Sequence, residues 1–217
     1  PKPGGSTLQG VIQRQYSVDL TYDIDGSGML ALQRSVDYLR SMSGRERNKI
    51  TCLKGHMPFG AHRLFNKPSV YVTMLRHPYE RAVSEYYFAR NTPNHGLYDL
   101  VRGGNMSLEA FLDLRKEQGL ANIYCRLLGE AFDWGNLADL PVKVCPGALD
   151  VAKRNINEHF SVVGLTECFD ASLLMMKNLL NWGDVSYVRR NVTANKPPQA
   201  SYTKQQRKAL FDFTDLD

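Results

Sequence analysis

Residues 69–78 read SVYVTMLRHP, a short run of mostly apolar and partly β-branched residues that ends at a proline. The part from Ser69 to Leu75 is the clearest strand of the sequence, and its nearly continuous apolar character predicts burial on both faces, as in a parallel sheet. Pro78 suits the first position of a helix, which we expect to continue to about Arg90. The stretch therefore predicts one strand–helix unit of a parallel α/β fold.

Further strands and helices are predicted on both sides of this unit. A second buried strand is expected at 160–165 and a short β-prone run at 49–53. Asp170 fits the N-cap of the next helix, with Phe169 and Leu174 as a hydrophobic staple and an end at Trp182-Gly183. The other helices are expected at about 8–22, 29–42, 107–117, 119–130 and 147–158, with a last polar helix running to the end of the sequence. This alternation predicts a parallel sheet flanked by crossover helices.

Length and composition indicate one globular domain over residues 1–217. Apolar residues make up 43% and charged residues 23%, which excludes wholesale disorder and fibrous repeats. The formal charge of +5 and a pI near 9.0 tilt the surface mildly toward anionic partners. No run of 18 apolar residues exists, so the sequence predicts no membrane span within this chain and leaves an anchor upstream open.

The four cysteines form no C-x-x-C pair and no cysteine–histidine spacing typical of zinc, so we expect no zinc site. A bridge between Cys125 and Cys145 would close a loop of about 20 residues and contribute roughly 3 kcal/mol in an oxidising compartment. The alternative is two unrelated buried thiols, and the sequence does not decide between them. Two glycosylation sequons, at Asn105 and Asn191, fit a secretory chain.

The chain opens on Pro1-Lys2-Pro3-Gly4-Gly5-Ser6-Thr7, directly before a predicted helix. Glycines let backbone N–H groups approach an anion, the helix start adds unpaired donors, and Lys2 adds a positive charge, so the loop suits a phosphate. A plain flexible turn is the alternative, and the Walker spacing is not met. Phosphate loops normally follow a buried strand, so we expect that the first strand is missing and that the chain is truncated at both ends.

Ligands of an open parallel sheet sit beyond the carboxyl ends of its strands, which singles out the residues after each predicted strand. Arg76 and, eight residues later, Ser84 could hold one phosphate by a guanidinium and a hydroxyl, or could simply be structural. His56 follows the run 49–53 and fits a general base, although a lone histidine is more often structural. His62 is a weaker candidate for the same role. The basic loop 189–198 could cover a nucleotide or be a solvated surface loop. We interpret the remaining histidines as structural: His77, His95 and His159.

Taken in order, four motifs carry a resemblance to a known family: Pro1-Lys2-x-Gly4-Gly5-Ser6-Thr7, Gly55-His56-x-Pro58, Leu75-Arg76-x-Pro78-x-x-Arg81-x-x-Ser84-x-Tyr86-Tyr87-Phe88, and Val163-Gly164-Leu165-Thr166-Glu167-x-Phe169-Asp170. Over nearly its whole length the chain resembles the sulfotransferases that use 3′-phosphoadenosine 5′-phosphosulfate. Within them it is most similar to the Golgi carbohydrate branch typified by heparan sulfate 2-O-sulfotransferase.

The resemblance implies a P-loop-type parallel sheet and a role for each matching residue. The 5′-phosphosulfate would lie on Lys2, Gly4, Gly5, Ser6 and Thr7, with Lys2 catalytic near the bridging oxygen. Arg76 and Ser84 would hold the 3′-phosphate, His56 would be the catalytic base, and Thr193 and Lys196 would contact the nucleotide. It also implies a hydroxyl acceptor on a carbohydrate, which includes anionic polysaccharides, no metal, no nucleic acid, and a Golgi lumen location with a type II anchor outside this chain.

Two departures from the family pattern bear on the acceptor. Lys54 stands where the 2-O branch has a histidine, and His77 stands where an aspartate commonly follows the phosphate arginine. Two other functions stay open: a P-loop kinase of a small metabolite, disfavoured by the lack of a lysine after the glycines and of an obvious magnesium-binding acid, and a non-catalytic polyanion-binding module. The second would use basic residues late in the chain: Arg189, Arg190, Lys196, Lys204, Arg207 and Lys208.

Overall fold

A computed structural model describes residues 5–26, 29–129, 134, 144–188 and 196–217. Within these residues it holds two small parallel sheets. The strand β1 (Thr21–Ile24) pairs with β2 (Cys52–Gly55), and β3 (Tyr71–Leu75) pairs with β4 (Phe160–Leu165). Each pair is joined by segments that contain helices, which is the parallel α/β arrangement that the sequence predicts.

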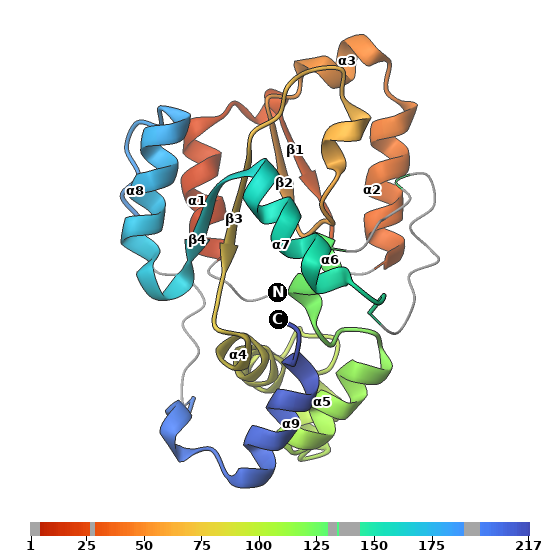
Figure 1. Cartoon of the computed structure of the whole chain (residues 1–217), viewed down its shortest axis with the longest axis vertical. Helices are drawn as coiled ribbons and strands as arrows, with labels where there is room; N and C mark the ends of the chain where they lie inside the picture. Colours follow the sequence, from red (N-terminus) through yellow and green to blue (C-terminus); the bar gives the residue numbers. More distant parts are fainter. Residues whose placement is uncertain (1–4, 27–28, 130–133, 135–143, 189–195) are drawn as a thin grey trace.

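Helices surround the sheets and form a separate group at one end (Figure 1). In Figure 1, α1 (Gly5–Gln15) and α8 (Phe169–Leu180) lie beside β3 and β4, and α2 (Met29–Ser41) and α3 (Gly44–Lys49) lie beside β1 and β2. α6 (Ile123–Gly129) and α7 (Ala148–His159) pack on each other and cross in front. The helices toward which β3 points are α4 (Pro78–Asn91), α5 (Leu108–Glu117) and α9 (Lys204–Thr214).

Local sequence accounts for several of these helix starts. Ser43 and Glu46 form a capping box at α3, and Thr203 and Gln206 form another at α9. The Ser107 hydroxyl accepts from the Ala110 N–H at the start of α5, and Pro78 occupies the first turn of α4, as predicted. The element that follows β3 therefore begins where the sequence places it.

The core is divided between the helical end and the two sheets. Buried side chains of α4, α5 and α9 pack together at the helical end: Ala82, Val83, Tyr86, Ala89, Phe111, Leu112, Leu210 and Phe213. A second cluster joins β1 to α2: Ile24, Leu32, Val36 and Leu39. A third joins α1 and α8 to the β3–β4 sheet: Val11, Met74, Val162, Leu173 and Met176. Both sheets are thus fixed from outside by helices, and this positions their carboxyl ends.

Two predicted elements differ from the structure near the N-terminal end. The helix expected over 8–22 ends at Gln15, and Thr21–Ile24 forms the strand β1, whose pairing with β2 outweighs the local helical pattern. The run expected at 49–53 is displaced to Cys52–Gly55, because α3 extends to Lys49. Sheet pairing with a distant segment is not visible in a local pattern of residues.

The strands are also less buried than predicted. In β3 only Met74 is buried, and β4 ends at Leu165 with 46% of that side chain exposed. The prediction that β3 is buried on both faces is therefore wrong. Residues of β3 line an open cleft, described below, and partial exposure follows from that position.

The start of α8 differs from the prediction as well. The N-cap is Cys168 without a side-chain cap bond, and Asp170 lies inside the first turn, where its carboxylate accepts from the Tyr187 hydroxyl. The helix ends at Leu180, with Asn181 in the left-handed conformation at its C-cap. The predicted N-cap at Asp170 is thus wrong by two residues, a usual margin for helix ends.

The cysteines are present as thiols in the described residues. Cys125 is buried and its thiol donates to the Leu216 carbonyl at 2.7 Å, whereas Cys145 is exposed. Of the two alternatives from the sequence, this arrangement supports separate thiols over the bridge.

Candidate active site

A large cleft runs between β2 and β3 and continues past their carboxyl ends, with a volume of about 1730 Å³. Its lining includes the residues that follow each of the four described strands: Asp25 and Gly26 after β1, His56 after β2, Arg76 after β3, and Thr166 and Glu167 after β4. Parallel strands bring their carboxyl ends to one edge, and this edge is where α/β proteins bind ligands. The described residues of the predicted site all line this cleft: Gly5, Ser6, Thr7, His56, Arg76, Ser84 and Lys196.

The first turn of α1 forms one wall of the cleft. The helix begins at Gly5, so the backbone N–H groups of Gly5, Ser6 and Thr7 belong to its first turn, which lines the cleft. A helix start of this kind attracts anions through these donors and through the helix dipole. Lys2 and Gly4, the other members of the predicted phosphate loop, lie outside the described residues.

His56 lies next to this helix start. A Cβ placed on Gly5 would be 3.8 Å from Cε1 of the His56 ring, so the ring is in van der Waals reach of the first residue of α1. On its other side the backbone of Gly26 packs directly on His56, because a Cβ there would overlap the His56 carbonyl oxygen and lie 2.5 Å from its Cβ. Gly55 turns the chain into this position with a φ of +142°, a conformation that side chains disfavour. The histidine is therefore held by two glycines beside an anion-attracting helix end.

Arg76 is fixed where β3 ends and α4 begins. Its backbone N–H donates to the Tyr124 hydroxyl at 3.1 Å, and its guanidinium contacts the Glu80 carboxylate at 3.4 Å. Burial lowers the pKa of Arg76 from its ordinary value, against an opposing attraction from Glu167, and burial raises the pKa of Tyr124 to about 12. Both groups keep their ordinary charge near neutral pH, so Arg76 brings a poorly solvated positive charge to the cleft.

Ser84 lies on α4, two turns after Arg76 in sequence. Only 1% of the residue is exposed, yet it contributes to the lining of the cleft. A hydroxyl and a guanidinium that line one cleft are donors that suit a phosphate group. The structure thus places both predicted phosphate residues in the lining of the same cleft.

Lys196 reaches the same wall from a segment more than a hundred residues later. Its ammonium makes an ion pair with Glu80, which also accepts from the Tyr202 hydroxyl at 3.5 Å. Burial, and then repulsion from the Arg76 guanidinium, lower the pKa of Lys196 to about 8. The shift indicates that two cations lie close together here. Thr193, the other predicted residue of this loop, lies outside the described residues.

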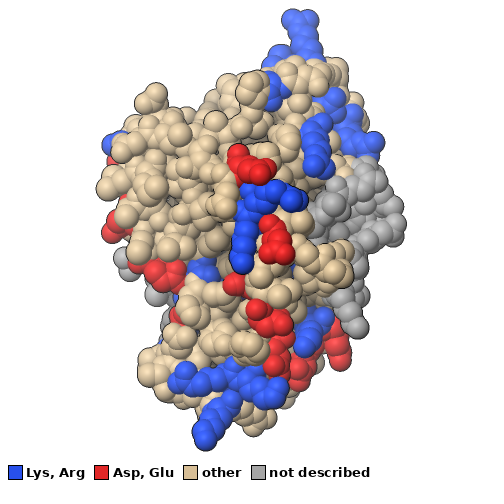
Figure 2. All heavy atoms as spheres, viewed as in Figure 1, with Lys and Arg blue, Asp and Glu red and all other residues tan. Residues whose placement is uncertain are grey.

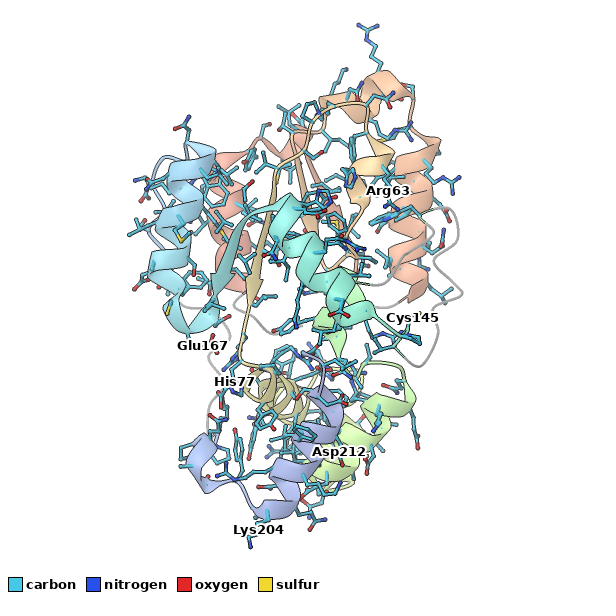
Figure 3. The ribbon with its side chains drawn as sticks, viewed as in Figure 1. Arg63, His77, Cys145, Glu167, Lys204 and Asp212 are labelled. Carbon is cyan, nitrogen blue, oxygen red and sulfur yellow. The ribbon has the colours of Figure 1, made fainter. Side chains whose placement is uncertain are left out.

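Sequence reasoning missed three residues of this site. Glu80 is the carboxylate between Arg76 and Lys196, and its spacing of four from Arg76 at the start of a helix was the available signal. Glu167 accepts from the backbone N–H of His77 at 2.9 Å and so joins the ends of β3 and β4; the two residues face each other in Figure 3. Gly26 carries no functional group, and its contact with His56 could not be seen in the sequence.

Lys54, the residue at which the chain departs from the family pattern, forms an ion pair within the cleft. Its ammonium pairs with Asp23, the residue opposite it in the β1–β2 register. Asp23 also accepts from the Gln9 amide at 2.9 Å, which connects this pair to α1. Lys54 is 10% exposed, so the pair contributes little net charge to the cleft.

The late basic residues do not form one open patch in the described chain. Arg207 donates to the carbonyls of Gln199, Ala200 and Tyr202, and Lys208 pairs with Asp212. Lys204 is exposed and points away from the body in Figure 3, while Arg189 and Arg190 lie outside the described residues. On the face shown in Figure 2, positive groups gather at the two ends and alternate with acidic groups in between.

The other histidines lie in different parts of the molecule. His62 lines the cleft, where its Nδ1 lies 2.8 Å from the Tyr71 hydroxyl; burial lowers its pKa. His77 caps the start of α4, His95 accepts from the Leu97 N–H, and His159 stacks on Phe59. The ring of His56, by comparison, lies close to the first residue of α1. Among the described residues there is no cluster of three metal-binding side chains and no helix long and apolar enough to cross a membrane.

The cleft has the donors needed for a ligand with two separated anionic groups. The N–H groups of α1 can bind one, and Arg76, Ser84 and Lys196 can bind the other. His56, in contact with α1, is the candidate proton acceptor near the first group. This set matches a transfer reaction at the first anionic group.

Comparison with known proteins finds sulfotransferases of two kinds. A galactose-3-O-sulfotransferase 3 of Bos taurus is 31% identical over 174 residues, which is 76% of this chain and 40% of that protein. A heparin sulfate O-sulfotransferase of Drosophila melanogaster is 29% identical over 146 residues, 64% of this chain and 40% of that protein. A heparan sulfate 2-O-sulfotransferase 1 of Xenopus laevis is 23% identical over 205 residues, 84% of this chain and 55% of that protein.

The chain therefore spans about half or less of the length of these relatives. The sequence model of the galactose-3-O-sulfotransferase family matches residues 19–214, which include the cleft residues from His56 to Lys196. The resemblance to carbohydrate sulfotransferases is thereby confirmed, and the chain belongs to the galactose-3-O-sulfotransferase family.

Proposed function

We propose that this chain catalyses transfer of a sulfuryl group from 3′-phosphoadenosine 5′-phosphosulfate to a hydroxyl of a carbohydrate. The observation that carries the proposal is one cleft lined by the start of α1, by His56 close to Gly5, and by Arg76, Ser84 and Lys196. The distribution of donors suits a nucleotide with a 5′-phosphosulfate and a 3′-phosphate. Family membership supports the same reaction class.

The residues that would hold the donor fall into two groups. The N–H groups of Gly5, Ser6 and Thr7, together with Lys2 and Gly4, would bind the 5′-phosphosulfate, and Lys2 would neutralise charge on the bridging oxygen. Arg76, Ser84 and Lys196, together with Thr193, would bind the 3′-phosphate. When bound, the donor supplies an activated sulfuryl group. We expect fixed cations and amides, and no metal, to stabilise the phosphate that departs.

His56 would act on the acceptor. A neutral imidazole accepts the proton of the attacking sugar hydroxyl while the new S–O bond forms and the S–O bond to the phosphate breaks in line. Gly26 and Gly55 hold the ring in place for this step. Deleting one hydrogen-bond donor at a group that gains negative charge commonly raises the barrier of such a reaction by about 3–4 kcal/mol. The α1 start and Lys2 would therefore contribute as much to the rate as the base.

Radiolabelled donor tests this directly. The full chain incubated with labelled donor and a panel of polysaccharides should label a hydroxyl acceptor, and His56→Ala should abolish the label while the affinity for adenosine 3′,5′-bisphosphate stays near that of the wild type. Full activity of His56→Ala would remove the base assignment. Absence of both transfer and bisphosphate binding in the wild type would remove the proposal.

The acceptor class follows from the relatives, whose names specify galactose and heparan sulfate. We propose a sugar hydroxyl without choosing between these two, because Lys54 is paired with Asp23 and gives no separate anion site. The compartment we propose is the Golgi lumen. Asn105, the first residue of a sequon, is exposed before α5, where a glycan could be attached.

We propose in addition that a further parallel strand, leading into the Pro1–Thr7 loop, fills part of the cleft. Consecutive residues 50–57 and 68–74, which include β2 and β3, line it, and within the described residues each of these strands pairs on one side only. The cleft also exceeds the roughly 300–1,000 Å³ of ordinary ligand pockets. Slow amide exchange along both edges in a protein extended upstream of Pro1 would support this P-loop-type sheet, and fast exchange there would contradict it.

A further inference from the structure

Glu80 occupies a central position on the wall of the cleft where the 3′-phosphate is proposed to bind. Its carboxylate contacts the Arg76 guanidinium at 3.4 Å, forms an ion pair with Lys196, and accepts from the Tyr202 hydroxyl at 3.5 Å. The side chain is 21% exposed and lines the cleft. Three segments, the end of β3, the first turn of α4 and the chain from Lys196 onward, thus meet at one carboxylate.

The charges around Glu80 explain why a carboxylate is needed there. Arg76 and Lys196 are both largely removed from water, with side-chain exposures of 19% and 14%, and they repel each other, as the lowered pKa of Lys196 records. Within the described residues, Glu167, Tyr124 and Tyr202 also act on Arg76, and the Tyr202 hydroxyl contacts Glu80. Without Glu80, the two cations would face each other with one partner fewer, and the Lys196 ammonium would move away from the Arg76 guanidinium.

Lys196 also begins the segment that closes this side of the cleft. Residues Lys196 to Gln199 contribute to the lining, and the short turn Gln199–Ser201 leads to Tyr202. The ion pair of Lys196 and the hydrogen bond of Tyr202 both end on Glu80, and the Tyr202 ring also packs in the buried cluster with residues of α4. The carboxylate therefore connects a segment from the end of the chain to the helix that carries Ser84.

We propose that Glu80 is a positioning residue of the donor site: it holds Lys196 against α4 beside Arg76, so that the two cations form one preformed seat for a phosphate. The inference rests on the proposed function, because the phosphate is that of the sulfuryl donor. Glu80 itself does not bind the donor. It acts through Lys196, and its effect depends on that residue being present.

Calorimetric titration with adenosine 3′,5′-bisphosphate tests this in the full chain. Glu80→Gln keeps the shape of the side chain and its hydrogen bond from Tyr202 but removes the charge, and it should weaken binding by about ten- to a hundredfold. Lys196→Met should weaken binding by a similar factor. The bisphosphate affinity of the double variant should then lie within about twofold of that of Lys196→Met. Glu117→Gln, an exposed position at the end of α5, is the matched control and should bind as the wild type does.

A pH profile separates positioning from loss of structure. Because the pKa of Lys196 is about 8, bisphosphate affinity of the wild type should fall as pH rises above this value. In Glu80→Gln the ammonium loses its counter-ion, so the fall should begin at a lower pH than in the wild type. A merely structural change would weaken binding at all pH values without moving this limb.

The outcomes are distinct. If the wild type binds no bisphosphate, the proposed function fails. If the wild type binds and Glu80→Gln binds equally well or more tightly, Glu80 is a bystander or a competitor of the phosphate, and the positioning role is wrong. Additive losses in the double variant, or an unmoved pH limb, would also overturn it.

Discussion

Gly26 determines the position of His56 although it has no functional group. Its backbone packs against the carbonyl and Cβ of His56, while the imidazole reaches the first residue of α1 on the other side. A side chain larger than hydrogen at position 26 would overlap His56 and displace it from this position beside the helix start. The proposed base is thereby placed by sterics between two segments rather than by a hydrogen-bond partner alone.

Gly26→Ala should therefore displace His56 and leave the phosphate residues in place. We expect transfer to fall by about a hundredfold, the cost of moving a reacting group by roughly 1 Å, with bisphosphate affinity within about threefold of the wild type. Single-turnover transfer and calorimetry measure the two quantities. Gly44→Ala is the control, since a Cβ at Gly44 meets nothing within 4 Å. Equal activity of the two variants would contradict the steric account.

At the scale of elements, the sequence predicts what depends on neighbouring residues and misses what depends on distant ones. β4 and the start of α4 lie where the sequence places them, because a β-branched run and a proline act locally. β1 was missed, since Thr21–Ile24 becomes a strand only by pairing with β2 about 30 residues later. Likewise Arg76, Ser84 and His56 were found by their place after predicted strands, whereas Glu80 and Gly26 matter through contacts across the cleft.

The contact of β4 with α8 depends on Gly164. A Cβ there would lie 2.8 Å from the Ser172 Cβ and would overlap the Met74 sulfur. The Ser172 hydroxyl also bonds the backbone of Leu165, so helix and strand cannot separate without losing this link. Gly164→Ala should lower the free energy of unfolding by about 1–3 kcal/mol, measured by denaturant titration. Gly103→Ala is the control, because a Cβ there has open space, and its free energy of unfolding should stay within about 0.5 kcal/mol of the wild type. A similarly small effect at Gly164 would show that α8 moves aside at little cost.

The start of α6 is capped by a residue far along the chain. Oδ1 of Asp217 accepts from the N–H groups of Tyr124 and Cys125 at 2.9 and 3.0 Å, and burial raises the pKa of Asp217 to about 6. The pKa of Asp217 in the folded chain lies above the ordinary 3.8, so its protonated form adds to the free energy of unfolding. This contribution is complete below about pH 4 and is lost as pH rises through 6.

Asp217→Asn should remove this pH dependence. The free energy of unfolding of the wild type, relative to that of the variant, should fall by about 2 kcal/mol between pH 4 and pH 7. Denaturant titrations at several pH values give this difference. Asp212→Asn, which breaks a surface ion pair with Lys208, should show little change over the same range. A constant difference for Asp217→Asn would mean that the carboxyl titrates as in the unfolded chain.

For the molecule as a whole, the cleft is a place where otherwise separate clusters meet. The α1 start belongs with the β3–β4 sheet, His56 follows the β1–β2 sheet, and Ser84 belongs to the helical end, with each region having its own buried core. A ligand that touches all three adds contacts between regions that share few of their own. Its binding should therefore stabilise the entire fold and not only the loops at the cleft.

Bisphosphate should consequently raise the melting temperature of the full chain without added metal. At a ligand concentration of one hundred times Kd, binding adds about 2.7 kcal/mol, which for a domain of this size corresponds to roughly 5–10 °C. His56→Ala should keep the shift, because the base contributes to transfer rather than to phosphate binding, whereas Arg76→Ala should lose most of it. Differential scanning fluorimetry with adenosine 3′,5′-bisphosphate, ATP and magnesium–ATP separates the alternatives. A shift of the melting temperature that requires magnesium–ATP would favour the kinase alternative. The cleft would then recognise a metal-bound triphosphate rather than a nucleotide with separate 3′- and 5′-phosphates.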